Sequence, residues 1–284
     1  MSTLPIIILS TTLFTPALRQ NQTDDLPQYG IVLSGGGALG FAHIGALLAL
    51  EEAGIEISMV SGASMGSMVG AMYTYGYSPK EMIAIIEKEK LYKNSKIFNF
   101  HLLSRSGLSD HKKVKKILDR ILPVDSFDSL KLFFALSMTN FIELETEYSC
   151  SGNRLKEKIM ASSAIPSVFE PVVINDIPYV DGGVMDNLPI EPIKGKCKKI
   201  IAIDVCAASK KTGTRGKVKI GYRAGLAMMK QINAGQIAQA DYYIGLDKLE
   251  QYSPFDFKKY KAIIQIGYEG MKQYLKEHPE MVNK

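Results

Sequence analysis

Residues 30–66 read GIVLSGGGALGFAHIGALLALEEAGIEISMVSGASMG. Two short apolar runs alternate here with two segments whose apolar residues recur at helical spacing. They predict a strand at 30–34, a helix at 38–53, a strand at 55–60 and a helix at 64–75. Strand, helix, strand and helix in this order form right-handed crossover units, so the stretch predicts an α/β fold with a parallel sheet.

The rest of the chain continues the same patterns. Further helices are predicted at 79–89, 111–121 and 262–275, and further strands at 132–139 and 200–205. Of the 284 residues, 46% are hydrophobic and 22% are charged, which is the composition of an ordinary globular chain and argues against disorder. No stretch has the composition of a linker, so residues 28–284 are predicted to form one domain.

The formal net charge of +5 is a mild basic excess that lies partly in short runs at 112–116 and 210–219. Such runs are usually solvated surfaces. Their functional alternative is a weak attraction to an anionic membrane, worth about 1 kcal/mol for each basic residue near the lipid. A nucleic-acid site would need a denser basic stripe interleaved with aromatic residues, so no nucleic-acid partner is expected.

The three cysteines, Cys150, Cys197 and Cys206, have no metal-type spacing, and an odd number argues against a disulfide framework. The four histidines show no paired spacing that would bind a metal. We therefore expect no metal that acts as a catalyst.

The N-terminal residues 4–14 (LPIIILSTTLF) are similar to the apolar region of a signal peptide, but no Lys or Arg precedes them. A cleaved export signal and a leader foreign to the native protein both remain open, and residues 1–27 are left out of the predicted domain. No apolar stretch is long enough to span a bilayer. We expect a cytoplasmic protein, with export as the alternative.

Residues 62–66 (GASMG) form a G-x-S-x-G motif between a predicted strand and a predicted helix. This is the setting of a nucleophile elbow, where the sharp turn needs neighbours without side-chain bulk, as Gly62 and Gly66 are. Ser64 would then stand at the carboxyl edge of the sheet, above the positive end of the following helix. The alternative is a glycine-rich turn in which Ser64 caps the helix, and the motif alone does not decide between them.

The glycine-rich segment 34–40 (SGGGALG) also lies between a strand and a helix. Backbone N–H groups at a helix N-terminus can hold an anion, such as the oxyanion of an acyl-transfer intermediate. The residues whose N–H groups would do so are Gly35, Gly36, Gly37 and Ala38. With Gly40, however, the segment also fits the G-x-G-x-x-G fingerprint of dinucleotide-binding proteins.

A dinucleotide site needs an acidic residue at the carboxyl end of the second strand, where the ribose would lie. The nearby acid, Glu56, opens that strand and would lie roughly 16 Å from the required edge. Ser64 stands at that edge instead. The arrangement therefore favours acyl transfer, although dinucleotide binding and an inactive lipid-binding module remain alternatives.

A serine nucleophile needs a base to take its proton. In α/β-hydrolases a histidine follows the acid in the chain, but His278 lies in a polar tail and the other histidines precede any such acid. Asp181 is the alternative base, because apolar residues lead into it and Gly182 and Gly183 follow it. The competing interpretation of this fragment is a D-G turn of a β-hairpin.

The motifs at 35–40, 62–66 and 181–183, in this order, resemble the patatin-like phospholipase family and its bacterial lipid acyl hydrolases. The stretches 42–47, 161–166 and 187–189 also look like this family, and the resemblance runs from about Tyr29 to Tyr274. It implies a three-layer α/β/α sandwich with a mainly parallel sheet and no cofactor. It further implies a catalytic dyad of Ser64 and Asp181, an oxyanion hole formed by the backbone of residues 35–38, and hydrolysis of acyl esters in phospholipids and related lipids.

Two features bear on the substrate. The family usually has Arg or Lys where this chain has Leu39, which leaves the reaction class in place but puts the preferred headgroup in doubt. The segment 92–107 is the predicted acyl-chain site or lid. Its apolar candidates, of which at least half are expected to be core residues, are Phe98, Phe100, Leu102 and Leu103.

Overall fold

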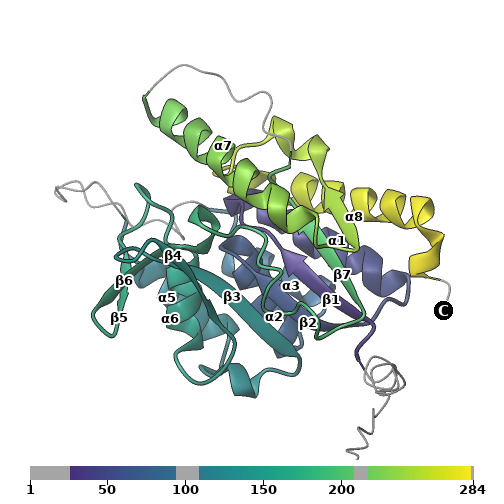
Figure 1. The fold of residues 1–284 in the computed structure, drawn as a ribbon, viewed down its shortest axis with the longest axis horizontal. Coiled ribbons are helices and arrows are strands. Elements are labelled where there is room, and N and C mark those ends of the chain that lie inside the picture. Colours follow the sequence, from purple (N-terminus) through teal and green to yellow (C-terminus); the bar gives the residue numbers. More distant parts are fainter. Residues whose placement is uncertain (1–25, 94–108, 208–216, 283–284) are drawn as a thin grey trace, which may run out of the picture.

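The structure is a computed structural model that describes residues 26–93, 109–207 and 217–282. In this part of the chain eight strands form one sheet in the order β5-β6-β3-β2-β1-β7-β8, with β4 paired to β3 (Figure 1). The strands are β1 (Tyr29–Leu33), β2 (Ile57–Gly62), β3 (Phe133–Asn140), β4 (Glu145–Ser149), β5 (Val172–Ile174), β6 (Ile177–Asp181), β7 (Lys199–Asp204) and β8 (Tyr242–Gly245). The helices are α1 (Phe41–Glu52), α2 (Met65–Tyr75), α3 (Pro79–Glu89), α5 (Lys112–Ile121), α6 (Leu155–Ser162), α7 (Lys217–Ile237) and α8 (Tyr260–Glu277).

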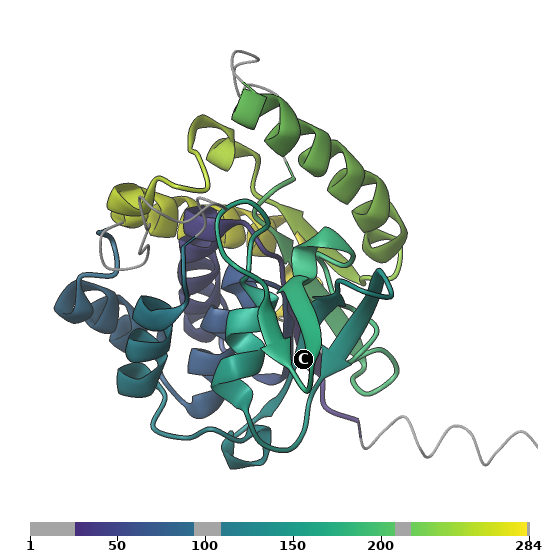
Figure 2. The same cartoon turned by 90° about the vertical axis from the view of Figure 1, so that its left-hand side faces the viewer.

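The sheet is buried on both faces. Ile31 and Leu33 of β1 belong to a large core shared with the helices α1, α2, α3, α5, α6 and α8. Val32, between them, points to a smaller core on the other face, which also receives Ile237 at the end of α7. Figure 2 shows helices on both sides of the strands, with α7 in green opposite the purple and blue helices. The predicted α/β/α layering with a central sheet is confirmed.

The predicted elements occur where the apolar patterns placed them, with ends shifted by up to three residues. The segment 38–53 is divided, because Gly37–Gly40 form a short 3-10 turn before α1 begins. Helix α2 ends at Gly76, whose φ of 114° suits a residue without a side chain. Helix α3 begins where Pro79 follows the N-cap residue Ser78, which forms a reciprocal capping box with Glu81.

The mainly parallel sheet is also confirmed, because β1 pairs in parallel with β2 and β7, β2 with β3, and β7 with β8. The sequence did not predict β4, β5, β6, β8, α6 or α7. Strand β5 has only three residues, and β4 reads ETEYS, which is too polar to show an apolar run. Strands β4, β5 and β6 add an antiparallel part at one side of the sheet. Within the described ranges, no helix is both long enough and apolar enough to cross a membrane.

Strand β3 aligns two segments that are far apart in the sequence. Its residue Leu136 pairs with Gly62 at the end of β2, and Met138 pairs with Asp181 at the end of β6. Strand β4 pairs with β3 at both positions and so occupies its other edge. Strands β2 and β6 therefore meet the same edge of β3 one after the other, about 7 Å apart along the strand. This register brings the end of β6 to the turn that follows β2.

Helix α8 crosses α1 at very close range. A Cβ atom on Gly45 of α1 would overlap the carbonyl oxygen of Ile264, and one on Gly267 of α8 would overlap that of Ala42. Glycine at both positions lets the two backbones touch. Since α1 follows directly on the glycine-rich segment 34–40, its close packing on α8 also fixes the position of that segment.

We therefore expect Gly267→Ala to lower the free energy of unfolding by about 1–3 kcal/mol, because the added methyl group overpacks the crossing. Gly235→Ala on α7 is the matched control, since nothing lies within 4 Å of a Cβ there. Alanine should stabilise that helix position by up to about 1 kcal/mol. Urea unfolding midpoints measure both changes. Equal effects in the two variants would contradict the close crossing.

Candidate active site

Ser64 lies in a strained turn between β2 and α2. Its φ of 51° and ψ of −121° are unusual for a residue with a side chain and match the sharp elbow that the motif predicts. A Cβ atom on Gly66 would overlap the carbonyl oxygen of Leu33, and one on Gly62 would lie 2.6 Å from the carbonyl carbon of Gly66. Both glycines are therefore required by the turn.

The structure brings the predicted nucleophile and the predicted base into contact. The Oγ of Ser64 donates a hydrogen bond to Oδ2 of Asp181 over 2.6 Å, and both side chains are buried. The other carboxylate oxygen, Oδ1, accepts the N–H of Gly183 at 2.8 Å. Asp181 ends β6, and the backbone then forms the 3-10 turn Gly182–Val184, so the fragment is not the tip of a hairpin.

The backbone on both sides of Asp181 is fixed as well. Its N–H donates to the carbonyl oxygen of Ala164 at 3.0 Å, and its carbonyl oxygen accepts the hydroxyl of Thr139 at 2.9 Å. A Cβ atom on Gly182 would overlap the carbonyl oxygen of Ser137, so the turn packs directly on β3. The carboxylate is therefore held at one place relative to Ser64.

Burial raises the pKa of Asp181 from its ordinary value near 3.8 to about 6, although the hydrogen bonds from Ser64 and Gly183 oppose the shift. The group is therefore mostly ionised at neutral pH, yet more basic than a solvent-exposed aspartate. A carboxylate with a pKa closer to the working pH is better suited to accept a proton from a hydroxyl.

The four N–H groups predicted for the oxyanion hole divide into two pairs. The N–H of Gly35 donates to Oδ1 of Asn187 at 3.0 Å, and the N–H of Ala38 donates to the carbonyl oxygen of Pro254 at 2.7 Å. The N–H groups of Gly36 and Gly37 have no acceptor among the described residues. Gly37 has a φ of 57° and lines the same cavity as Ser64. Two of the predicted donors thus fix the loop, and the other two have no partner within the described part of the chain.

The remaining residues of the glycine-rich segment pack against their surroundings. A Cβ atom on Gly40 would lie 2.7 Å from the Cβ of Met65, so the loop rests directly on the start of α2. Leu39, at the position where the family that the sequence resembles usually has Arg or Lys, is buried in the large core. The loop and the elbow of Ser64 therefore form one packed unit.

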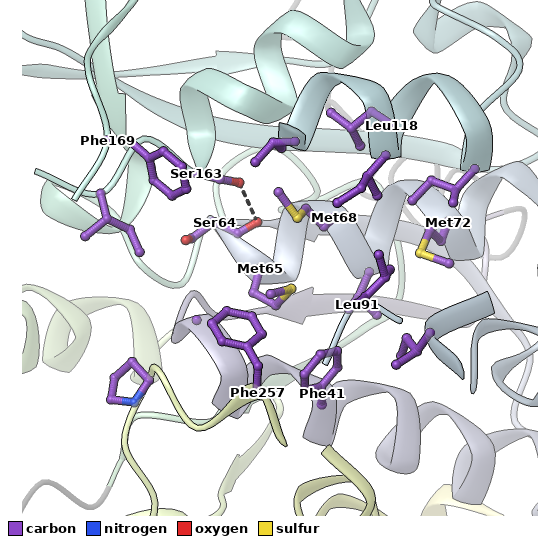
Figure 3. Close-up of a pocket in the computed structure, with 18 of the residues that line it drawn as sticks. Phe41, Ser64, Met65, Met68, Met72, Leu91, Leu118, Ser163, Phe169 and Phe257 are labelled. Carbon is purple, nitrogen blue, oxygen red and sulfur yellow. Dashed lines mark hydrogen bonds between the residues drawn. The ribbon is translucent and has the colours of Figure 1, made fainter. Parts of the chain in front are cut away.

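Sequence analysis missed four residues that hold this unit together. Ser162 accepts the N–H of Ser64 on its Oγ at 3.0 Å, and the Oγ of Ser163 donates to the carbonyl oxygen of Ser64 at 3.3 Å (Figure 3). The other two are Asn187 and Pro254. Residues 161–166 and 187–189 were noticed for their resemblance alone, and Pro254 carries no local signal because only its backbone carbonyl takes part.

An apolar cavity begins at Ser64 and follows α2 (Figure 3). Its long wall carries Met65, Met68 and Met72, which span about 10 Å along the helix axis. Helix α5 forms the opposite wall with Val114, Ile117, Leu118 and Ile121. The sequence predicted this helix at 111–121 with a basic run at 112–116, and the four cavity residues form its apolar side. The predicted acyl-site residues at 98–103 lie outside the described residues.

None of the described histidines forms a hydrogen bond with Ser64. His43 is buried, its Nε2 donates to the carbonyl oxygen of Ser34 at 2.8 Å, and burial lowers its pKa to about 4. His111 lines the cavity and donates to a backbone carbonyl oxygen at 2.7 Å. His278 stacks on a tyrosine near the C-terminus. The fourth, His101, lies outside the described residues.

The raised pKa of Asp181 predicts how stability depends on pH. Because the carboxylate is less favourable in the folded chain than in the unfolded chain, its ionisation lowers the free energy of unfolding as pH rises from about 4 through 6. Asp181→Asn removes this charge and keeps an acceptor for Gly183. It should therefore be more stable than the wild type at pH 8 by up to about 3 kcal/mol and similar to it at pH 4.

Urea unfolding of both proteins at the two pH values measures this difference. The other buried carboxyl with a pKa raised to about 6, Asp186, is present in both proteins, so its titration cancels in the comparison. If Asp181→Asn were less stable than the wild type at both pH values, the role of Asp181 would be to hold the turn.

Comparisons with known proteins identify the family of sequences to which this chain is similar. The sequence model of the patatin-like phospholipase family matches residues 31–194. The chain is 27% identical over 300 residues to lysophospholipase NTE1 of Kluyveromyces lactis, which covers 93% of this chain and 20% of that protein. It is also 27% identical over 280 residues to lysophospholipase nte1 of Aspergillus niger, covering 87% of this chain and 18% of the relative. The chain thus spans about a fifth of the length of these relatives.

Among solved structures, the fold is similar to VipD from Legionella pneumophila, with a TM-score of 0.54 and 17% sequence identity. The match covers 89% of this chain and 67% of VipD. At this identity the likeness concerns the fold, and it agrees with the α/β architecture described above.

Proposed function

The chain belongs to the patatin-like phospholipase family, and from this we propose that it hydrolyses acyl esters of phospholipids or related lipids. Ser64 acts as the nucleophile and Asp181 as its base. The observation that carries the proposal is the 2.6 Å hydrogen bond between the two buried side chains. A carboxylate in direct contact with the hydroxyl can accept its proton without a histidine between them.

In the first half of the reaction, Asp181 takes the proton of the Ser64 hydroxyl while Oγ attacks the ester carbonyl carbon. The carbonyl oxygen becomes an oxyanion. When the tetrahedral intermediate collapses, the bond to the alcohol oxygen breaks and the proton held by Asp181 passes to that oxygen. The products are a free alcohol, such as a glycerophospho-alcohol, and an acyl ester on Ser64.

In the second half, a water molecule takes the place of the alcohol. The water oxygen attacks the acyl carbon while Asp181 accepts one proton from the water. When the bond between the acyl carbon and Ser64 Oγ breaks, Asp181 returns this proton to Oγ. A free fatty acid leaves and the starting state is restored. The strained backbone of Ser64 keeps Oγ at the carboxyl edge of the sheet throughout.

The oxyanion is bound by the N–H groups of Gly36 and Gly37. Support comes from the backbone hydrogen bonds of the loop, because the N–H groups of Gly35 and Ala38 are used by Asn187 and Pro254. This narrows the predicted four donors to two. Each donor of this kind contributes about 3 kcal/mol to the stability of the transition state.

The apolar cavity beside Ser64 accepts the acyl chain. Side chains from α2 and α5 line it over about 10 Å, which suits a flexible hydrocarbon chain better than a polar headgroup. The relatives named lysophospholipases support a phospholipid with one acyl chain as a substrate class. Dinucleotide binding has less support, since two of the four N–H groups are already used and Ser64, not an acid, follows β2.

The first test uses a fluorophosphonate probe, which forms a covalent bond with activated serines. We expect the wild-type protein to be labelled on Ser64, and Ser64→Ala to lose both labelling and hydrolysis of a short-chain nitrophenyl ester. Ser61→Ala is the matched control, because Ser61 is buried on β2 and its hydroxyl has no partner among the described residues. Mass mapping of the labelled peptide identifies the site. Absence of labelling in folded wild-type protein would favour an inactive lipid-binding module.

The second test concerns pH. Because Asp181 must be ionised to accept a proton, kcat/KM should fall about tenfold per pH unit below the pKa of Asp181, which burial raises to about 6. Initial rates on the nitrophenyl ester between pH 4.5 and 8 measure the profile. Asp186→Asn should retain this acidic limb, since Asp186 bonds Tyr148 rather than Ser64. A flat profile in folded wild-type protein would contradict the role of Asp181.

A further inference from the structure

Four large apolar side chains are exposed together on the antiparallel part of the sheet. Three lie on the turn between β3 and β4, and the fourth lies on β5. Their exposed fractions are 54% for Phe141, 60% for Ile142, 60% for Leu144 and 58% for Val173. The N–H of Phe141 donates to the carbonyl oxygen of Pro178, which is the residue paired with Val173. We call these four residues the apolar tip.

The apolar tip projects from the edge of the sheet that carries the active site. Strand β3 runs parallel to β2, so both strands end at the edge where Ser64 stands. Asp181 pairs with Met138, and the apolar tip begins three residues further along β3, about 10 Å from Met138 along the strand. Figure 2 presents this group of hairpins toward the viewer. Phe255, which lines the cavity beside Ser64, is also 40% exposed.

The turn holds these side chains outward. Oδ1 of Asn140 accepts the N–H groups of Ile142 and Glu143 at 3.0 and 3.1 Å, and the Asn140 side chain also donates to Glu147 at 2.7 Å. Leu144 has a φ of 55°, a backbone conformation that Gly, Asn or Asp would adopt with less strain. A strained and exposed leucine in a well-bonded turn indicates a contact made by its side chain.

We propose that the apolar tip inserts into a zwitterionic phospholipid surface and so holds the cavity beside Ser64 against the bilayer. Four side chains on one narrow projection are far fewer than the 20–30 residues on each side of a stable dimer, which argues against a second copy of this chain as the occupant. Glu143 and Glu145 are exposed among them, so the tip offers no attraction to anionic lipid. Apolar insertion therefore has to supply the binding.

For its substrate the proposal rests on the proposed function, but the docking itself does not. Vesicle binding is therefore measured in Ser64→Ala protein, which leaves the lipid intact. We expect this protein to co-sediment with phosphatidylcholine vesicles. Adding Ile142→Asp should weaken the partition coefficient at least about tenfold, since the burial of one aliphatic side chain contributes a factor of that order.

Val282→Asp is the matched control and should bind like the parent. Val282 is also exposed, at 42%, but it lies beside Met281, whose carbonyl oxygen bonds Tyr29 at the start of β1. It is therefore at the opposite edge of the sheet. Equal loss of binding in both variants would overturn the assignment to the apolar tip, as would wild-type binding that requires anionic lipid.

A second measurement separates docking from chemistry. In protein with Ser64 intact, Ile142→Asp should lower the ratio of turnover on phosphatidylcholine vesicles to turnover on a monomeric nitrophenyl ester. An unchanged ratio would overturn the proposal, as would a dimer in light scattering that Ile142→Asp abolishes.

If the wild-type protein binds vesicles but hydrolyses no ester, the proposed function fails and the docking surface stands. If the protein hydrolyses the ester but does not bind vesicles, the docking proposal fails and the proposed function stands.

Discussion

Ser64 Oγ and Asp181 Oδ2 lie 2.6 Å apart although the two residues are 117 positions apart in the chain. Strand β3 brings the two side chains together, because β2 and β6 pair with successive positions on the same edge of β3. The turn after β2 and the end of β6 therefore meet at the carboxyl edge of the sheet. The glycines of both turns are required by the same packing, since a Cβ atom on Gly66 or Gly182 would overlap a neighbouring backbone carbonyl.

Burial of Asp181 beside Ser64 lowers the stability of the fold at neutral pH, but it makes the carboxylate a better base. Burial raises the pKa of Asp181 to about 6, which means that ionisation at neutral pH is less favourable than in water. The surrounding backbone offsets part of this by donating the N–H of Gly183. The glycine-rich loop shows a similar division, in which Gly35 and Ala38 anchor the backbone while Gly36 and Gly37 keep their N–H groups free of acceptors within the described residues.

Sequence patterns predicted the part of this structure whose signals are local. Apolar runs bounded by glycine located β1 and β2, and the G-x-S-x-G and D-G-G motifs located Ser64 and Asp181. The antiparallel strands could not be predicted in the same way, because β5 has three residues and β4 is mostly polar. Their pairing with β3 depends on tertiary contacts.

Contacts between distant segments also account for the site residues that were missed. Asn187 and Pro254 act on the glycine-rich loop through one side-chain oxygen and one backbone carbonyl. Asn187 stood out only through the family resemblance of residues 187–189, which did not indicate this contact, and Pro254 has no pattern in the local sequence. The cavity wall on α5 could have been predicted from the sequence, since Val114, Leu118 and Ile121 have helical apolar spacing. Because lysines lie between them, the segment was interpreted as a solvated surface instead. Exposed apolar residues on a turn, such as Ile142, are recognised only when the structure shows which edge they occupy.

The central claim is that Asp181 activates Ser64, and kcat of Asp181→Asn at pH 8 tests it most directly. Folding of the variant is verified by its melting temperature in the same preparation. An amide at this position can bond the hydroxyl but cannot accept its proton, so kcat should fall by about three orders of magnitude with KM little changed. A near-normal kcat in folded Asp181→Asn would contradict the account and would leave Ser64 without a base among the residues that contact it.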